Sequence, residues 1–309
     1  MTKVIMFHQF YNDRYYHCKG AVNEDQFYNF CKKLITEFEI IDPNNHKQLF
    51  KEKGILLTFD DGLKSQFEIA SKVLKFFDIK AIFFIFSSIF SNNFNLLEVY
   101  KYFSHSYFES IDEFYQKYFS YIFKNKSEFD LLIRKYDHHI KLMKSNSPFY
   151  SLNDIVYRLL RFEILSTNEF DDSHLYMIKK ITGHKIEDFK EKLHINKDDI
   201  NELIKYGNVI GNHSYSHAYD LHKKSYKDQL MDYKKSNQLL KKICKVNIDY
   251  CAFPFGLYDE NTLKVINELD FKFSFLANHK NKFIDKKILS RFDHSLLISN
   301  NNVDFSLLK

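Results

Sequence analysis

Two kinds of apolar pattern alternate along both ends of this chain. Short, nearly continuous apolar runs occupy residues 3–10, 54–59, 79–86, 208–213, 247–253, 271–275 and 288–292. Such runs are typical of strands in a sheet that is covered on both faces. Between them, apolar residues recur with helical spacing over residues 23–38, 63–77, 198–205, 226–244 and 261–269. This alternation of strand and helix predicts an α/β fold with a parallel sheet.

The middle of the chain departs from this alternation. From residue 92 to residue 192 the pattern is helical, with predicted helices at 96–108, 111–123, 129–143, 152–165 and 171–181. A connection of about one hundred residues is far too long for a plain loop between a strand and a helix. We therefore predict that residues 1–91 and 193–309 form one α/β domain and that residues 92–192 are a helical insertion. Among the histidines of this insertion, the adjacent His138 and His139 point apart on a helix and are predicted to lie on the surface.

The first candidate chemistry lies at the end of one strand. The apolar run at residues 54–59 is followed by Asp60, Asp61 and Gly62. The carboxyl ends of parallel strands are where α/β folds place their functional residues. Two adjacent carboxylates repel each other unless a cation or a proton separates their roles. The pair therefore predicts a bound metal ion.

A second group of polar residues follows a later strand. His213 and His217 stand four residues apart just after the run at residues 208–213. In a helical turn this spacing lets both rings face one point. Two neutral imidazole nitrogens and one carboxylate are the ligands of a hydrolytic zinc-type site, which leaves a position open for water. The histidine pair alone is a weak signal, but together with the aspartates it becomes a strong one.

Composition narrows the choice of partners. The 309 residues include 45 basic and 40 acidic ones, a net charge of +5, and no basic stripe, so we do not expect nucleic-acid binding. The four cysteines have no CxxC spacing and are predicted to be reduced core residues. No signal peptide or transmembrane segment is recognisable, so we expect a cytoplasmic protein. The sequence does not reveal an oligomeric state.

Three motifs resemble those of one known family. The chain is similar to polysaccharide deacetylases of the NodB-homology type, carbohydrate esterase family 4, and the resemblance covers both ends of the chain but not residues 92–192. It implies an irregular (β/α)7 barrel, here with a large helical insertion. The matching motifs are Thr58-Phe59-Asp60-Asp61-Gly62, His213-Ser214-Tyr215-Ser216-His217 and Phe253-Pro254-Phe255-Gly256.

The resemblance also implies roles for individual residues. Asp61, His213 and His217 would hold a divalent metal, most commonly Zn²⁺. Asp60 would be the general base, since a carboxylate that is not a ligand is free to accept a proton from the attacking water. The backbone N–H of Phe255 would help to stabilise the tetrahedral oxyanion.

The chain also departs from the family pattern. Ala252 stands where the family usually has an arginine that orients the base, and the motif that contains a tryptophan is missing because the chain has no Trp. We predict that Arg291 replaces the missing arginine as the partner of Asp60. His294 is a candidate for the general acid that protonates the leaving amine. His8, which follows the first strand, is another candidate, and a histidine with a local structural role is the alternative for both.

These observations predict a metal-dependent hydrolase that removes an N-acetyl group from an amino sugar of a glycan or glycan precursor. Because a cytoplasmic protein is expected, the substrate would be a nucleotide-, lipid- or small-glycan-linked precursor. Two alternatives stay open. One is a deformylase or another small-amide hydrolase on the same fold. The other is a carbohydrate-binding protein that kept the metal site and lost turnover.

Overall fold

The computed structural model describes residues 2–45, 54–146, 150–278, 287–299 and 302–308. By its internal contacts the chain divides into two units. The first contains residues 1–95 and 190–309, and the second contains residues 96–189. The sequence analysis placed the boundaries of the insertion at residues 92 and 192, close to these divisions.

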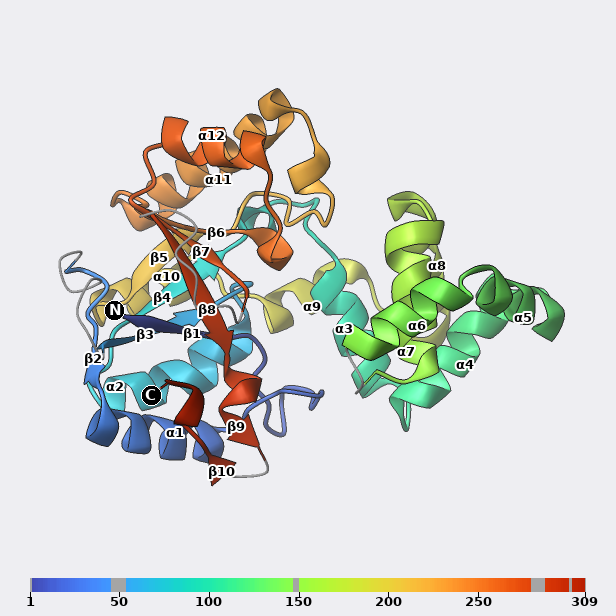
Figure 1. Ribbon diagram of the computed structural model, residues 1–309, viewed down its shortest axis with the longest axis horizontal. Coiled ribbons are helices and arrows are strands. Elements are labelled where there is room, and N and C mark those ends of the chain that lie inside the picture. Colours follow the sequence, from blue (N-terminus) through green and yellow to red (C-terminus); the bar gives the residue numbers. More distant parts are fainter. Residues whose placement is uncertain (1, 46–53, 147–149, 279–286, 300–301, 309) are drawn as a thin grey trace. The chain divides into compact units, whose positions relative to one another are not determined.

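The first unit is built on a closed barrel, as the family resemblance implied. In the part of the chain that the structure describes, seven parallel strands form the ring, and β1 closes it by pairing with both β3 and β8 (Figure 1). A short strand, β2 (Glu39–Ile40), extends the sheet beside the start of β3. The ring consists of β1 (Lys3–Phe7), β3 (Gly54–Phe59), β4 (Ala81–Ile85), β5 (Val209–Asn212), β6 (Tyr250–Ala252), β7 (Phe273–Leu276) and β8 (Ile288–Asp293).

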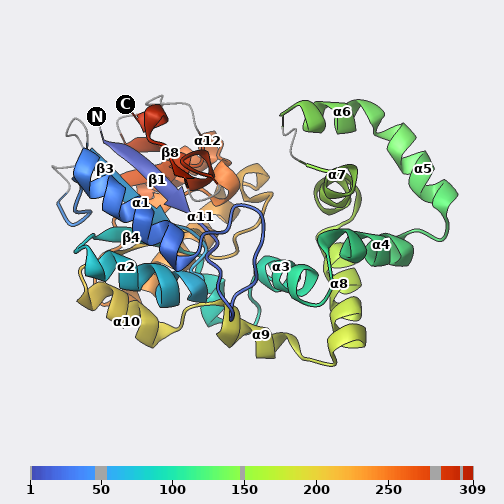
Figure 2. The same ribbon diagram turned by 90° about the horizontal axis from the view of Figure 1, so that it is seen from below.

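Amphipathic helices cover the outside of this barrel. Figure 2 shows α1, α2 and α10 running along the outer side of the strands. Asn23 caps α1, because its side chain accepts a hydrogen bond from the Gln26 N–H and the Gln26 side chain accepts one from the Asn23 N–H. The helices are α1 (Glu24–Glu37), α2 (Ser71–Phe76), α10 (Lys197–Lys205), α11 (Tyr226–Cys244) and α12 (Glu260–Glu268).

The alternation of side chains along each strand divides the core into two layers. In β3, Ile55, Leu57 and Phe59 pack with the surrounding helices, whereas Leu56 belongs to the cluster inside the barrel. Because successive side chains point to opposite faces, Thr58 also faces inward and the next inward position after it is residue 60. Strand geometry therefore directs Asp60 toward the barrel interior.

The second unit is entirely helical in its described residues. The predicted helix at 129–143 is in fact two helices, because Tyr136 leaves the helical conformation (φ −107°, ψ 18°) between them. The sequence analysis did not predict α9 as a separate helix. The helices that begin in the insertion are α3 (Leu97–Ser106), α4 (Ile111–Ile122), α5 (Lys126–Lys135), α6 (Asp137–Asn146), α7 (Leu152–Leu159), α8 (Thr167–Thr182) and α9 (Ile186–Leu193).

The remaining described elements are small. The strands β9 (Ile298–Ser299) and β10 (Asn302–Val303) pair antiparallel near the C-terminus. Across the described ranges, no helix combines the length and the hydropathy that a membrane span requires.

Candidate metal centre

The two aspartates leave the barrel at the C-terminal end of β3. The Asp60 N–H donates to the carbonyl of Phe7 (3.0 Å), so the ladder between β1 and β3 continues one residue past the strand. Asp61 then turns the chain with a positive φ of 77°. The buried Gln66 side chain fixes this turn from below, because its amide donates to the carbonyls of Asp60 (2.6 Å) and His8 (2.8 Å).

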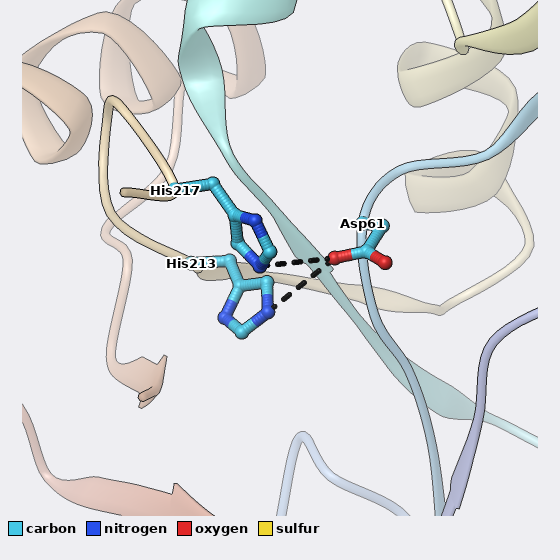
Figure 3. A group of neighbouring side chains, drawn as sticks. All are labelled: Asp61, His213 and His217. Carbon is cyan, nitrogen blue, oxygen red and sulfur yellow. Dashed lines mark ion pairs between the residues drawn. The ribbon is translucent and has the colours of Figure 1, made fainter. Parts of the chain in front are cut away.

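Asp61, His213 and His217 come together at this edge of the barrel (Figure 3). The Oδ1 atom of Asp61 lies 3.6 Å from Nε2 of His213 and 3.3 Å from Nε2 of His217. All three side chains are buried, and their ligand atoms lie within 4.8 Å of one another. The structure therefore brings together the three residues that the sequence analysis proposed as metal ligands.

The orientation of His213 suits a metal ligand. Its Nδ1 lies 2.8 Å from the carbonyl oxygen of Ala252, which can only accept a hydrogen bond. Nδ1 must therefore carry a proton, and Nε2, which lies toward Asp61, is the nitrogen that would bind a metal. A second partner of this kind fixes the tautomer of metal-binding histidines in general. The donor set of two imidazoles and one carboxylate thus fits a divalent metal such as Zn²⁺.

Asp60 is held by a different partner. Arg291 of β8 donates from Nη1 to Oδ1 (2.6 Å) and from Nη2 to Oδ2 (2.7 Å), so the two planar groups are joined by a bidentate ion pair. Both side chains are buried inside the barrel. The contact that the sequence analysis predicted between these two residues is present. Because Ala252 occupies the usual place of the orienting arginine, the guanidinium reaches the base from another strand.

This ion pair sets the charge of Asp60. Burial is the largest single effect and raises the pKa of the Asp60 carboxyl, but the charges of Arg291, His213 and His8 and the hydrogen bonds from Arg291 together outweigh it. The pKa of Asp60 is therefore lower than that of an ordinary aspartate, and the carboxylate is ionised at neutral pH. A carboxylate that is ionised, aimed and not needed as a metal ligand can act as a base.

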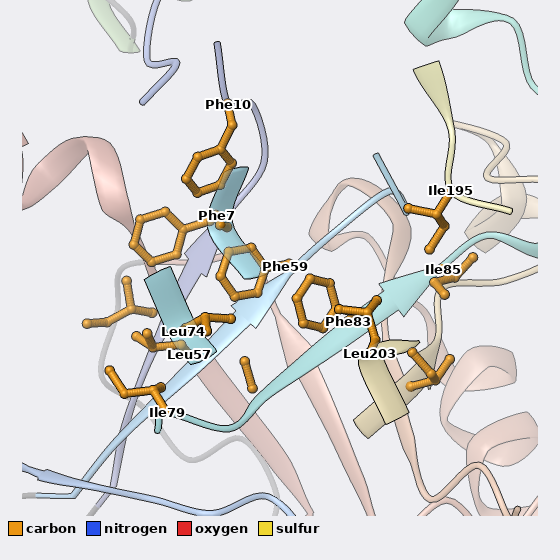
Figure 4. Packing of buried hydrophobic residues seen from close by; sticks show 14 of the residues in the cluster. Phe7, Phe10, Leu57, Phe59, Leu74, Ile79, Phe83, Ile85, Ile195 and Leu203 are labelled. Atoms are coloured by element: carbon orange, nitrogen blue, oxygen red, sulfur yellow. The ribbon is translucent and has the colours of Figure 1, made fainter. Parts of the chain in front are cut away.

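Aromatic packing holds the strand that carries both aspartates. The Phe59 ring stacks on Phe83 of β4 (4.6 Å between centroids) and on Phe7 of β1 (5.4 Å) (Figure 4). All three rings are buried in the layer between the barrel and its helices. Since Phe59 precedes Asp60 directly, this packing fixes the point from which the two carboxylates leave the strand.

A family model described as polysaccharide deacetylase matches residues 172–274, about a third of the chain. The matched segment contains His213, His217 and Phe255 but does not include Asp60 and Asp61. The resemblance to polysaccharide deacetylases is confirmed. A comparison with curated proteins gave no match.

Solved structures with a similar fold include one described as a deacetylase and one described as a de-N-acetylase. The Streptococcus pyogenes deacetylase PplD is 15% identical, with a TM-score of 0.54 over 94% of this chain and 91% of that one. IcaB from Ammonifex degensii is 14% identical, with a TM-score of 0.55 over 97% of this chain and 92% of that one. A de-N-acetylase from Aggregatibacter actinomycetemcomitans is 11% identical, with a TM-score of 0.54 over 99% and 98%. At sequence identities this low, the structural similarity shows a shared fold alone.

The residues of the third deacetylase motif lie beside the ligands. Phe255 adopts a positive φ of 57°, and its ring centroid is 4.7 Å from that of His217. Its ring also contacts Tyr219 edge-on at 5.3 Å. Positive φ values at Asp61, Ser214 and His217 accompany it, so strained backbone is concentrated around the candidate site.

His294 lies in an environment that differs from the one its predicted role requires. Its Nδ1 is 3.1 Å from the Met6 carbonyl and its Nε2 is 2.7 Å from the Gly20 carbonyl, so both ring nitrogens face backbone. The ring stacks on Phe7 at 4.7 Å, and burial lowers its pKa. The role of His294 as general acid stays a prediction, and its contacts favour the structural alternative.

His8 lies beside the carboxylate of Asp60. Its Nε2 is 3.7 Å from Oδ2 of Asp60, and its side chain keeps 33% of its surface exposed. The sequence analysis named it only as a second candidate, because a single histidine after a strand carries no spacing signal.

Asp232 is a residue of the site that the sequence analysis missed. It lies in α11, and its carboxylate accepts hydrogen bonds from the N–H groups of Tyr215 (2.7 Å) and Ser216 (3.2 Å). These two residues lie between His213 and His217, so Asp232 anchors the loop that carries both ligands. Asp232 is one of two acidic residues on the predicted helix at residues 226–244, and nothing in the pattern of that helix indicates this contact.

Proposed function

We propose that this chain is a hydrolase that removes an N-acetyl group from an amino sugar of a glycan or glycan precursor. The observation that carries the proposal is the ionised Asp60, clamped by Arg291 beside the group of Asp61, His213 and His217. The proposed base Asp60 and the proposed ligand Asp61 are adjacent residues with different partners. Arg291 binds Asp60, whereas Asp61 faces the two histidines. This division of roles is what a metal-assisted hydrolysis requires.

Asp61, His213 and His217 would hold the divalent metal, which we propose to be Zn²⁺. Such an ion would polarise the acyl oxygen and lower the pKa of a water molecule towards ~7. Asp60 takes the proton of the attacking water, and Arg291 keeps its carboxylate ionised and in a fixed orientation. The backbone N–H of Phe255 is the proposed donor to the oxyanion that forms when water adds to the acyl carbon.

The leaving amine needs a proton when the C–N bond breaks. We assign this step to His8 rather than to His294. His8 lies near Asp60 and is partly open to solvent, whereas the ring nitrogens of His294 face two carbonyls in the core. Nε2 of His8 (3.7 Å) and Nε2 of His213 (3.9 Å) both lie near Oδ2 of Asp60, so two imidazoles line the carboxylate that starts the reaction.

Deacetylation of amino-sugar substrates tests the proposal. N-acetylglucosamine oligomers and nucleotide-linked N-acetyl sugars would be incubated with the Zn²⁺-loaded protein, and released acetate and formate would be measured separately. Acetate release that stops after chelation and falls about a thousandfold in Asp60→Asn is the expected result. Asp60→Asn keeps the shape of the side chain, and its metal content should equal that of the wild type.

Other outcomes would favour the remaining alternatives. Formate as the product would indicate a deformylase. Glycan binding without hydrolysis, in protein of full metal content, would indicate a binding protein, although Arg291 now supplies the partner of Asp60 whose absence first suggested that alternative. Equal activity of wild type and Asp60→Asn would overturn the assigned base. The cytoplasmic location stays a prediction, which cell fractionation would check.

A further inference from the structure

The chain segments that lead into and out of the helical insertion lie against the two loops that carry the candidate metal ligands. The incoming segment covers residues 86–95, and the outgoing segment covers residues 190–195; both belong to the barrel unit. They are tied to each other, because Nζ of Lys190 donates to the carbonyl of Ser91 (2.6 Å). Each segment contacts a different ligand loop.

The incoming segment binds successive carbonyl groups of the loop between the two histidines. The N–H of Ser87 donates to the carbonyl of Ser214 (3.2 Å), and the N–H of Ser88 donates to that of Tyr215 (3.0 Å). The side-chain amide of Asn95 then reaches the carbonyls of Ser216 and His217, both at 3.1 Å. Every carbonyl from residue 214 to residue 217 is thereby hydrogen-bonded to residues 87–95.

The orientation of the Asn95 amide follows from its partners. Both neighbours are carbonyl oxygens, which accept and cannot donate, so the NH₂ end must face them. Each of its two N–H groups has one acceptor. One side chain thus binds the backbone carbonyls on both sides of the His217 α-carbon. The φ angle of His217 is 50°, which lies in the left-handed region. A residue other than glycine keeps such a conformation only where its surroundings impose it.

The outgoing segment makes the corresponding contact with the aspartate loop. The N–H of Ile195 donates to the carbonyl of Gly62 (3.1 Å), and Leu63 pairs with His194 in an antiparallel bridge. Gly62 directly follows Asp61. The Phe86 ring of the incoming segment contacts both the His194 ring (5.4 Å) and the His217 ring (5.1 Å). Both ligand loops are therefore braced by the chain segments that flank the insertion.

We propose that Asn95 is a positioning residue for His217, and that through it the segment at residues 86–95 helps to set the geometry of the metal-binding group. The proposal rests on the proposed function only in that the group binds a divalent metal. Asn95 does not contact the ligand atoms; it acts through the backbone of Ser216 and His217. Loss of such an outer partner weakens metal binding about tenfold to a hundredfold in other metal sites.

Binding of Co²⁺ to the metal-free protein tests this proposal with a readout that does not depend on activity. The visible absorption bands of bound Co²⁺ report the geometry of the ligand set, and a titration gives the affinity. For Asn95→Ala we expect about tenfold to hundredfold weaker Co²⁺ binding and altered bands. Asn93→Ala is the matched control, because Asn93 is an exposed asparagine two residues away and its variant should behave as wild type.

The outcomes separate this proposal from the proposed function. Wild-type affinity and bands in Asn95→Ala overturn the positioning role, whatever the enzyme hydrolyses. Weaker binding and altered bands in a protein that hydrolyses no amide support the role and contradict the function. Wild-type protein that binds no Co²⁺ overturns both. If Asn95→Ala fails to fold, Asn95→Asp gives the same comparison, because it keeps the size of the side chain and replaces the donating end with an acceptor.

Discussion

Buried histidines lie in both units of the molecule, and the pair His213 and His217 of the barrel differs from His174 of the insertion in what its ring nitrogens face. In the barrel, the Nε2 atoms of His213 and His217 both face the carboxylate of Asp61. In the insertion, His174 is also buried, but its Nδ1 faces the Phe170 carbonyl (2.8 Å) and its Nε2 faces the Tyr157 hydroxyl (2.8 Å). The first arrangement directs one ring nitrogen of each histidine at a shared carboxylate, and the second places both ring nitrogens against uncharged hydrogen-bond partners.

The side chains around His174 also differ from those around His213 and His217. The His174 ring lies against the rings of Tyr100 and Phe170, each at 4.3 Å, and burial lowers its pKa to about 3. His213 and His217 instead face the Asp61 carboxylate, and His213 also lies 3.9 Å from Asp60. Burial of a histidine is therefore a poor indicator of a functional site. What distinguishes the site is convergence of its nitrogens on another ionisable group.

The largest expected effect concerns the buried ion pair between Asp60 and Arg291 in the barrel. Arg291→Leu would leave Asp60 as an unpaired buried carboxylate, which we expect to cost about 3–5 kcal/mol of unfolding free energy, as measured by urea denaturation. Arg14→Ala is the control, because Arg14 pairs with Glu68 (2.8 Å) at the surface and its loss should cost less than about 1 kcal/mol.

A double variant shows whether the unpaired charge is the cause. Adding Asp60→Asn to Arg291→Leu removes the carboxylate and should recover part of the lost stability. Equal stability of the single and double variants would mean that Arg291 acts through packing, for example against the Phe84 ring 5.4 Å from its guanidinium.

The second prediction compares two histidines within the barrel. His294 resembles His174, since both of its ring nitrogens face backbone carbonyls, whereas His8 lies beside Asp60. We expect His8→Ala to lower kcat about a hundredfold, close to 2.7 kcal/mol, because the leaving amine loses its proton donor. His294→Gln should leave kcat of the folded fraction nearly unchanged and lower the melting temperature. The reverse pattern in acetate-release kinetics would restore His294 as the acid.

The sequence predicted those features that depend on neighbours along the chain. The strand Gly54–Phe59 was predicted with its bounds because an apolar run and two glycines mark it. The grouping of Asp61 with His213 and His217 was predictable because motifs place each of them just after a strand. Arg291 was predictable as a partner of Asp60 because it lies in the last strand and the usual arginine is missing.

Contacts between distant polar residues were not predictable in the same way. Asn95 reaches a loop 121 residues further along the chain, and no periodicity records which carbonyl an asparagine will meet. Asp232 is one of two acidic residues on an amphipathic helix. The choice between His8 and His294 depends on whether ring nitrogens face a carboxylate or two carbonyls, which only the folded backbone decides. The break at Tyr136 within the predicted helix at 129–143 has no glycine or proline to mark it.

The smallest expected effect concerns His174, the buried histidine of the insertion. The His174 pKa is about 3 in the folded protein, because burial disfavours the charged ring, against an ordinary value of 6.5. Below about pH 6.5 the unfolded chain therefore binds a proton that the folded one does not, and stability present at neutral pH is lost as the pH falls towards 3. From these two pKa values His174 should account for about 2 kcal/mol of lost stability at pH 5.

Urea denaturation of His174→Phe at pH 7 and pH 5 measures this contribution. The variant should be less stable than wild type at pH 7, because the Tyr157 hydroxyl and the Phe170 carbonyl lose a partner. Between pH 7 and pH 5 it should lose about 2 kcal/mol less stability than wild type, while its Co²⁺ bands stay unchanged. An identical pH dependence in the two proteins would mean that the folded insertion accepts a proton on His174. The contrast between a packing histidine and a ligand histidine would then depend on ring orientation alone.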